Sequence, residues 1–210
     1  VHNARLEYEA KTRSIGGNTE IDYCSNETVS FIRRRDEKNA EFLKRRSVLV
    51  KETGQLINLY DLHLKQAERK FNESYFIIKN LEAIATERGL MPYMLTLTAP
   101  ANYHPNPMNG RSSFDQTSSH DSQKYLSRTW AKLRALLNKR GTPFSLEKCF
   151  GVRTAELHKD GCVHWHILMF IDPTTLDGFQ KCLDFYFTSR QADVKEIDGV
   201  AAATYVLKYI

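Results

Sequence analysis

A predicted β-hairpin over residues 150–171 constrains the fold of this sequence more than any other stretch. Apolar and β-branched residues flank Lys159-Asp160-Gly161 on both sides. A three-residue loop that ends in glycine is common in hairpins, because glycine accepts the left-handed backbone conformation that the bulge requires. This loop pairs Glu156 with His164 on the facing strand. The sequence therefore predicts the register of one antiparallel strand pair.

The same register predicts a metal site. Side chains alternate between the two faces of a strand, so His164 and His166 point the same way, and Glu156 joins them from the neighbouring strand. Two imidazoles and a carboxylate on one face can bind a divalent metal and leave room for a substrate oxygen. A strand histidine alone is more often packed or solvated, so the prediction depends on the opposed carboxylate.

A second candidate group lies in residues 203–210. This stretch is rich in alanine and contains neither glycine nor proline, which favours a helix. Tyr205 and Tyr209 are four residues apart and share a helix face, with Lys208 at the edge of that face. Two tyrosines on a helix that faces the core usually serve packing. A metal site in the same small domain adds a second interpretation, in which they are nucleophiles.

Taken together, these motifs resemble those of the HUH endonucleases with two tyrosines. His164-Trp165-His166 followed by Tyr205-x-x-Lys208-Tyr209 is most similar to the bacteriophage replication gene A protein family, whose members initiate rolling-circle replication. The sequence LTLTAPANYHP at residues 95–105 resembles the first motif of that family. The resemblance extends from roughly residue 24 to the end. Leu157 and Val163 replace two prolines that are common in the family pattern.

The resemblance implies a site-specific, single-stranded DNA endonuclease and strand transferase. A tyrosine, Tyr205 or Tyr209, would attack an origin phosphodiester and form a 5′-phosphotyrosine and a free 3′ hydroxyl, with Lys208 favouring the phenolate. Mg²⁺ or Mn²⁺ would be the cofactor, held by His164, His166 and Glu156. The implied partners are single-stranded or extruded origin DNA and the replication helicase and polymerase of the host, in the bacterial cytoplasm.

Composition agrees with these expectations. The net charge of +5 and the pI of about 9.0 favour a polyanionic partner. The apolar runs are too short to span a membrane, so no membrane partner is expected. The four cysteines form no CxxC pair, which fits a reduced, cytosolic compartment.

Basic and aromatic residues around the predicted hairpin are candidates for DNA contact. The loop over residues 100–121 is long, and loops of this length are often functional. Tyr103 could stack on a base, or it could anchor the loop to the domain. Lysine and arginine on the predicted helix 122–140 could contact phosphates. The candidates are Tyr103, His104, Arg111, Lys132, Arg134 and Arg153.

The order of predicted elements indicates the α+β class. A strand at residues 91–99, a helix at 122–140, the hairpin, a helix after Asp172 and a strand at 193–197 fit an antiparallel sheet with helices on one side. The family resemblance implies a central antiparallel β-sheet of this kind, with the His-x-His strand in its middle. Helical periodicity predicts two helices, at about 27–51 and 55–88. The expected domains are a loosely ordered lead-in at 1–26, a helical N-terminal region at 27–89 and an HUH endonuclease domain at 90–210.

Three alternatives stay open at this stage. The chain could bind origin DNA without cutting it. It could instead be an interaction module with a structural zinc site, because the predicted register places four possible zinc ligands on one face: His158, Cys162, His164 and His166. Finally, the histidines could be polar core residues, with the basic helices serving a protein partner.

Overall fold

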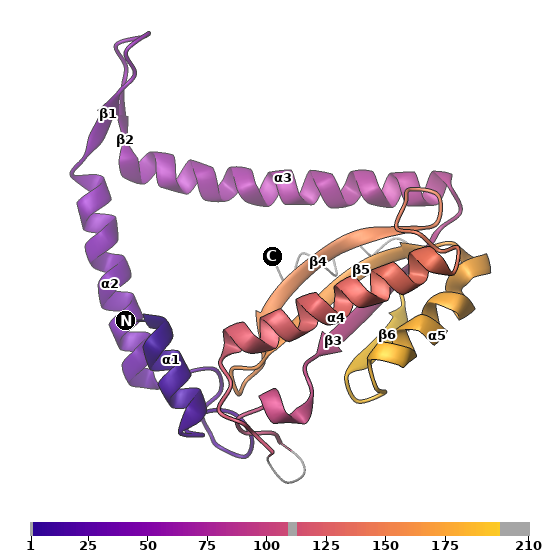
Figure 1. The fold of residues 1–210 in the computed structure, drawn as a ribbon. Coiled ribbons are helices and arrows are strands. Elements are labelled where there is room, and N and C mark those ends of the chain that lie inside the picture. Colours follow the sequence, from indigo (N-terminus) through magenta and orange to yellow (C-terminus); the bar gives the residue numbers. More distant parts are fainter. Residues whose placement is uncertain (1, 109–112, 198–210) are drawn as a thin grey trace.

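The computed structural model describes residues 2–108 and 113–197 (Figure 1). Its elements, in order, are α1 His2–Lys11, α2 Asn26–Lys44, β1 Ser47–Leu49, β2 Leu56–Asn58, α3 Leu59–Glu87, β3 Met91–Thr98, η1 Ala101–Tyr103, α4 Ser119–Lys139, β4 Cys149–Leu157, β5 Val163–Ile171, η2 Pro173–Thr175, α5 Leu176–Tyr186 and β6 Ala192–Glu196. None of the helices within these ranges combines the length and the apolar character needed to cross a bilayer.

The central sheet is antiparallel throughout, with strand order β4-β5-β3-β6. The His-x-His strand β5 lies in its interior, as predicted. β4 and β5 are joined by the predicted turn, in which Gly161 has a φ of 86° and His158 N donates to Cys162 O. Glu156 is paired with His164. The α+β class and the predicted register of the hairpin are therefore confirmed.

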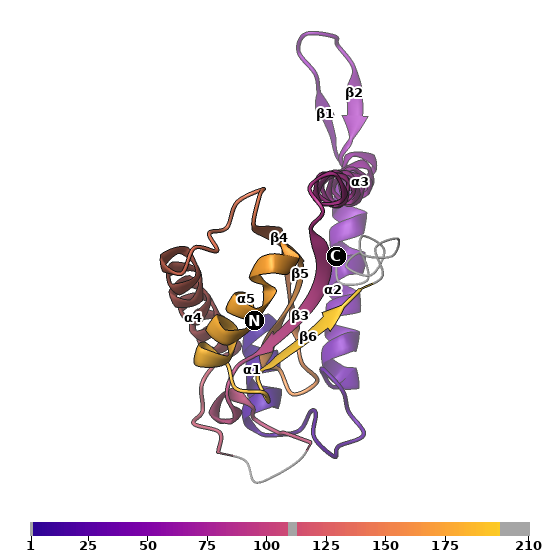
Figure 2. The same ribbon diagram turned by 90° about the vertical axis from the view of Figure 1, so that its right-hand side faces the viewer.

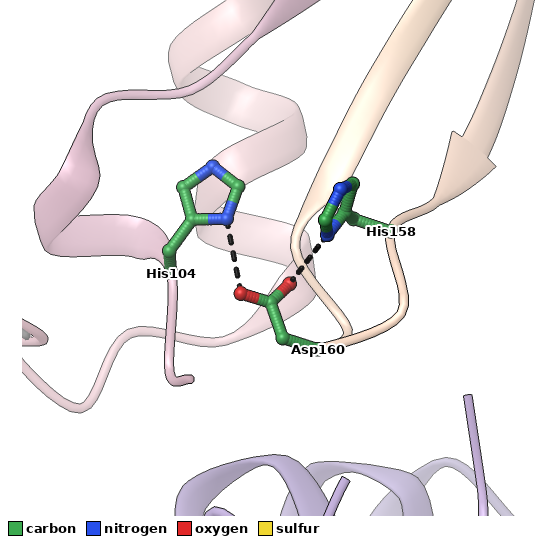
Figure 3. Close-up of side chains that lie close together, drawn as sticks. All are labelled: His104, His158 and Asp160. Carbon is green, nitrogen blue, oxygen red and sulfur yellow. Dashed lines mark hydrogen bonds and ion pairs between the residues drawn. The ribbon is translucent and has the colours of Figure 1, made fainter. Parts of the chain in front are cut away.

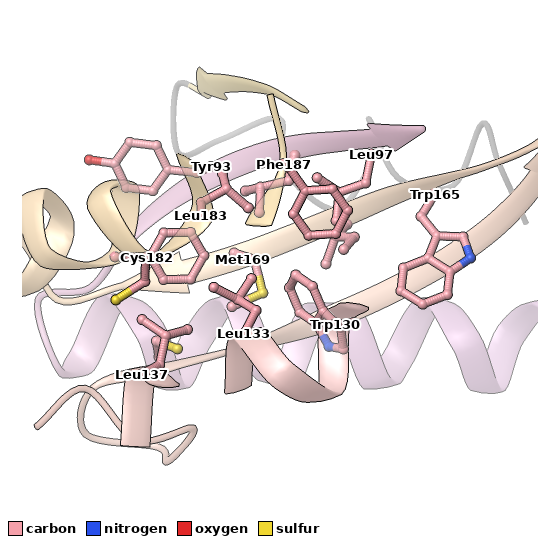
Figure 4. Close-up of a cluster of buried hydrophobic side chains, with 14 of the residues drawn as sticks. Tyr93, Leu97, Trp130, Leu133, Leu137, Trp165, Met169, Cys182, Leu183 and Phe187 are labelled. Carbon is pink, nitrogen blue, oxygen red and sulfur yellow. The ribbon is translucent and has the colours of Figure 1, made fainter. Parts of the chain in front are cut away.

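One face of the sheet packs against α4 and α5 (Figure 2). Alternate residues of β5, including Trp165, Ile167 and Met169, point to this face and are almost completely buried. The apolar stripe of α4 meets them, and Trp130 lies edge-on to Trp165 with ring centroids 6.3 Å apart (Figure 4). This layer forms the main hydrophobic core.

The opposite face of the sheet is covered along only part of its length. Near one end, Ile78 of α3 packs in a second apolar cluster with Met94, Leu168 and Phe170. Towards the hairpin turn, the same face carries polar side chains instead: Thr96, Thr98, Thr154, Glu156, His164 and His166. The expectation that helices cover only one side is wrong, because α3 packs against the apolar end of the second face.

The N-terminal region departs from the two predicted helices. α2 ends at Lys44, and residues 47–58 form a two-stranded hairpin in which Val48 pairs with Ile57 before α3 begins. This hairpin projects away from the rest of the chain (Figure 2). Its β-branched residues favour strands, and Gly54, with a φ of 69°, completes the turn. Helical periodicity on either side concealed this short interruption.

The predicted lead-in also contains ordered structure. Helix α1 is fixed to α2 by Glu9, whose carboxylate accepts hydrogen bonds from the backbone N–H of Ser25 and from the hydroxyls of Ser25 and Thr28. The segment after α1 then crosses the turn of the β4–β5 hairpin, where Tyr23 N donates to Lys159 O. Helix α1 and these contacts were not predicted, because they depend on residues that meet only in the folded chain.

A core substitution tests the packing of α4 on the sheet. Leu133 is fully buried, so Leu133→Ala leaves a cavity and should lower the free energy of unfolding by about 2–4 kcal/mol. Urea denaturation followed by circular dichroism measures the change. The matched control is Leu146→Ala, because Leu146 is 43% exposed; it should change stability by less than about 0.5 kcal/mol. Equal losses in both variants would contradict this packing.

Candidate functional site

Glu156, His164 and His166 converge on the polar half of the second sheet face. Glu156 Oε2 lies 3.6 Å from His164 Nε2 and 3.1 Å from His166 Nε2. One ligand atom from each residue lies within 4.8 Å of the others. The group arises because β4 and β5 pair in the predicted register, which brings residues of two strands to one face.

The two histidines of this group are held in the neutral form. Burial, reinforced by the neighbouring His166 and His158, lowers the pKa of His164 to about 4. Burial also lowers the pKa of His166, although Glu156 opposes this effect. The contact between His166 and Glu156 is therefore a hydrogen bond of a neutral imidazole at neutral pH. Neutral imidazole is the form that binds metal ions.

The surroundings of His166 also suit a metal ligand. Its Nδ1 lies 3.3 Å from Thr96 Oγ1 on the neighbouring strand. Without a metal, Nε2 donates to Glu156. When a cation takes the place of this proton, the ring proton is on Nδ1, which donates to Thr96 Oγ1, and the Nε2 lone pair is free to bind the cation beside Glu156. A hydrogen bond to the other ring nitrogen is the usual way in which proteins orient a histidine ligand. We conclude that the residues of this group fit a divalent cation.

A second group lies beside the first, at the hairpin turn. Asp160 lies between two imidazoles, with one carboxylate oxygen directed at each (Figure 3). His104 Nδ1 is 3.0 Å from Asp160 Oδ2, and His158 Nδ1 is 3.5 Å from Asp160 Oδ1. The other ring nitrogen of His104 lies 3.1 Å from Thr98 Oγ1. Asp160 therefore ties the loop after β3 to the β4–β5 turn.

Asp160 is a buried carboxylate, with a side-chain exposure of 1%. Burial alone would raise its pKa, but the hydrogen bond from His104 and the nearby imidazole of His158 outweigh burial and hold the pKa well below its ordinary value. Asp160 in turn raises the pKa of His158. Its Oδ1 also accepts from the backbone N–H of Cys162. The carboxylate is thus ionised and satisfied from several sides.

The two groups are joined by imidazole rings in edge-to-face contact. His158 lies 5.7 Å from His104 and 5.5 Å from His164, and His164 lies 4.7 Å from His166, measured between ring centroids. Cys162 belongs to neither group within the described residues. The structural zinc site predicted as an alternative has no support among the described residues, because its four ligands do not form one group: His158 lies with Asp160, and His164 and His166 lie with Glu156.

The sequence did not predict the bridge through Asp160. Asp160 was interpreted only as a turn residue, and His104 only as a candidate for DNA contact. These residues are far apart in the chain, and neither lies in a periodic pattern that would reveal a shared face. The only available signal was the presence of an aspartate between two histidine-bearing segments, which is too common to identify a bridge.

The candidates for DNA contact are divided between the two sides of the sheet. Tyr103 packs against Tyr125, with ring centroids 5.2 Å apart, and is partly buried. Arg153 lies over the Trp165 ring and Arg134 over the Phe144 ring, on the face that carries α4. Lys132 is exposed on α4 itself. Of the described candidates, only His104 lies beside the metal group.

Four predicted site residues lie outside the described residues: Arg111, Tyr205, Lys208 and Tyr209. Their assignment as DNA-contacting or catalytic residues stays a prediction from the sequence.

Comparison with known proteins gives the family. Residues 9–210 match the family model described as bacteriophage replication gene A protein (GPA). The chain belongs to this family. A gene A family assignment agrees with the resemblance inferred from the two motifs, and it extends that resemblance to α1.

Several curated proteins are similar to this gene A family chain. The replication protein of Haemophilus phage HP1 is 31% identical over 206 residues, which cover 90% of the chain and 25% of that protein. The replication gene A protein of Escherichia phage 186 is 33% identical over 168 residues, covering 78% and 24%. A probable replication endonuclease from a prophage-like region of Salmonella typhimurium is 35% identical over 155 residues, covering 71% and 18%.

The chain thus spans about a quarter or less of the length of these relatives. No solved structure matches it significantly. The geometry of the two histidine groups is therefore the basis for assigning chemistry to this gene A family chain.

Substitution of Asp160 tests the bridge at the hairpin turn. Because its folded pKa is lowered, Asp160 stabilises the fold above its unfolded pKa of about 3.9, and this contribution is lost as the pH falls further. Asp160→Asn should cost about 2–4 kcal/mol near neutral pH. The difference in the free energy of unfolding between the variant and the original chain should shrink below about pH 4. Urea denaturation across this range measures both effects.

The matched control is Asp177→Asn, since Asp177 forms an exposed ion pair with Lys181 on α5. It should cost less than about 1 kcal/mol. If the difference caused by Asp160→Asn stayed constant down to acidic pH, the lowered pKa would be wrong.

Proposed function

We propose that this chain is the nicking domain of a replication initiator. It cleaves one strand of a replication origin through a tyrosine, with a divalent metal as cofactor. The observation that supports this function best is the convergence of Glu156, His164 and His166 on the polar half of the second sheet face in a gene A family chain. The name of the Salmonella relative, a probable replication endonuclease, supports the same reaction class.

The proposed ligand set would hold Mg²⁺ or Mn²⁺. A bound divalent cation polarises a phosphodiester oxygen and stabilises the charge that develops in phosphoryl transfer. Glu156 supplies the anionic ligand, and His164 and His166 supply neutral nitrogens whose pKa values are lowered by burial. Thr96 orients His166. The residues thus form one rigid side of the site, because all are on strands of the central sheet.

Tyr205 and Tyr209 are the proposed nucleophiles. A phenolate oxygen attacks phosphorus, the bond between phosphorus and the 3′ oxygen breaks, and the leaving 3′ oxygen takes up a proton. The products are a 5′-phosphotyrosine and a free 3′ hydroxyl from which synthesis starts. A free tyrosine has a pKa of about 10, so a cation is needed to favour the phenolate. Lys208 is the proposed residue for this role.

Two tyrosines permit two successive transfers. The covalent bond conserves the energy of the broken linkage, so the second tyrosine can cleave the regenerated origin while the first releases its strand for rejoining. Residues four apart on a helix are about 6 Å apart along its axis, so either hydroxyl could reach one phosphate.

Single-stranded or extruded origin DNA is the proposed substrate. A phosphate inside a duplex would not easily reach a site on the face of a sheet, and the net charge of +5 favours a polyanion. The replication helicase and polymerase of the host are the proposed further partners, in the bacterial cytoplasm.

Removal of a proposed ligand tests the metal-dependent step. His166→Ala should reduce formation of the covalent adduct by more than about a hundredfold. Thr96→Val should weaken Mn²⁺ binding by about tenfold, because it removes only the hydroxyl that orients His166. Calorimetry measures Mn²⁺ binding, and a denaturing gel measures the adduct on a single-stranded origin oligonucleotide. His120→Ala, at an exposed histidine on α4, is the control. Full activity in a chelator would contradict the proposal.

Phenylalanine substitutions test the nucleophiles, since they keep the ring and remove only the hydroxyl. Tyr205→Phe and Tyr209→Phe should each remain folded, and at least one should still form an adduct. The double variant should form none while it retains DNA binding, which also separates cleavage from simple origin binding. Peptide mapping of the trapped adduct identifies the attached residue. An adduct on any other residue would exclude the two-tyrosine mechanism.

A further inference from the structure

A cavity of about 740 Å³ adjoins the metal group and shares His164 with it. Its walls come from the end of β3, the loop that follows, His158 on the hairpin and the segment just before β6. One wall is apolar and consists of Ala99, Pro100, Ala101, Pro107 and Met108. The cavity therefore lies beside the metal group. Of the three proposed metal ligands, it is lined by His164 alone.

The polar lining of the cavity is cationic or neutral. Arg190 is exposed at its edge, and Thr98, Thr188 and Gln191 provide hydroxyl and amide groups. No carboxylate lines the cavity among the residues that the structure describes. An apolar wall with a few polar groups is typical of sites that bind a flat organic ligand. The positive edge favours a ligand that carries phosphate.

We propose that this cavity binds the nucleobase next to the scissile phosphate, and that it determines which base is accepted there. The inference rests on the proposed function, because a phosphodiester held at His164 carries a covalently attached nucleoside on each side. A cavity that shares His164 with the metal group is within reach of one of these two nucleosides. The apolar wall covers the base, and Arg190 contacts the adjacent backbone.

The wall between the metal group and the cavity is held in place by the second histidine group. His158 lies against His164 and is fixed from below by Asp160, while His104 is fixed by Asp160 and Thr98 (Figure 3). A binding wall that is ordered before the ligand arrives loses less entropy on binding. This gives the bridge through Asp160 a role in positioning the base relative to the cleaved bond.

The first experiment identifies the preferred bases from a random pool, whatever the sequence of the origin. The complete chain is incubated with Mn²⁺ and a randomised single-stranded DNA library, and the covalent adducts are isolated and sequenced. We expect a base preference at one of the two nucleotides that flank the cut. If no library member forms a metal-dependent adduct, the proposed function fails, and the assignment of the cavity falls with it.

Replacement of that nucleotide by an abasic one then tests whether the cavity binds its base. Removing the preferred base should weaken binding by the original chain about tenfold, as expected for one well-contacted base. Ala101→Trp, which places a ring at the cavity wall, and Arg190→Ala, which removes the cation, should each weaken binding of the intact strand. In Ala101→Trp, the further loss on removing the base should be less than about twofold, since the two changes affect one contact.

The controls are Ala131→Trp and Arg140→Ala, at exposed positions of α4 and at its C-terminal end. Both should retain the tenfold abasic effect and the base preference of the original chain. If Ala101→Trp and Arg190→Ala also retain both, while metal-dependent cleavage is intact, the cavity does not bind the base. If the original chain shows no base preference at either flanking nucleotide, the proposal is also wrong.

Discussion

The pairing of β4 with β5 is the interaction on which the rest of the structure depends. Because side chains alternate along a strand, a shift of one residue in this pairing would move Glu156 to the face that carries α4. The register is fixed at the turn, where Gly161 adopts a positive φ and Asp160 accepts the N–H of Cys162. A turn of a few residues thus determines both the main core and the composition of the metal group.

Much of this arrangement could be predicted from sequence because it follows from local rules. Alternation along a strand, a glycine-containing turn and the apolar stripe of α4 each depend on neighbouring residues only. They were sufficient for the α+β class and for the convergence of Glu156, His164 and His166, whereas the place of β5 inside the sheet was implied only by the family resemblance. The candidate metal group is therefore a consequence of short-range pattern.

The features that sequence did not predict depend on long-range contacts. Ile78 of α3 meets Phe170 across a large sequence separation, and nothing in the periodicity of α3 specifies which sheet face it covers. The attachment of α1 depends on the fit of Glu9 to Ser25 and Thr28. The bridge from His104 to Asp160 requires two loops to meet. Local propensity does not indicate which distant residues will contact one another.

The path of residues 12–23 over the hairpin turn has a consequence for how this chain can be divided. Gly16 lies so close to Asp160 that a Cβ on Gly16 would be 2.7 Å from the Asp160 Cα. A fragment cut at residue 90 would remove this cover and would also strip α3 from Met94, Leu168 and Phe170. Water would then reach a carboxylate that is now enclosed, and an apolar patch would become a surface for self-association. The N-terminal segment thus covers both polar and apolar surface of the histidine-bearing sheet that would otherwise be exposed to water.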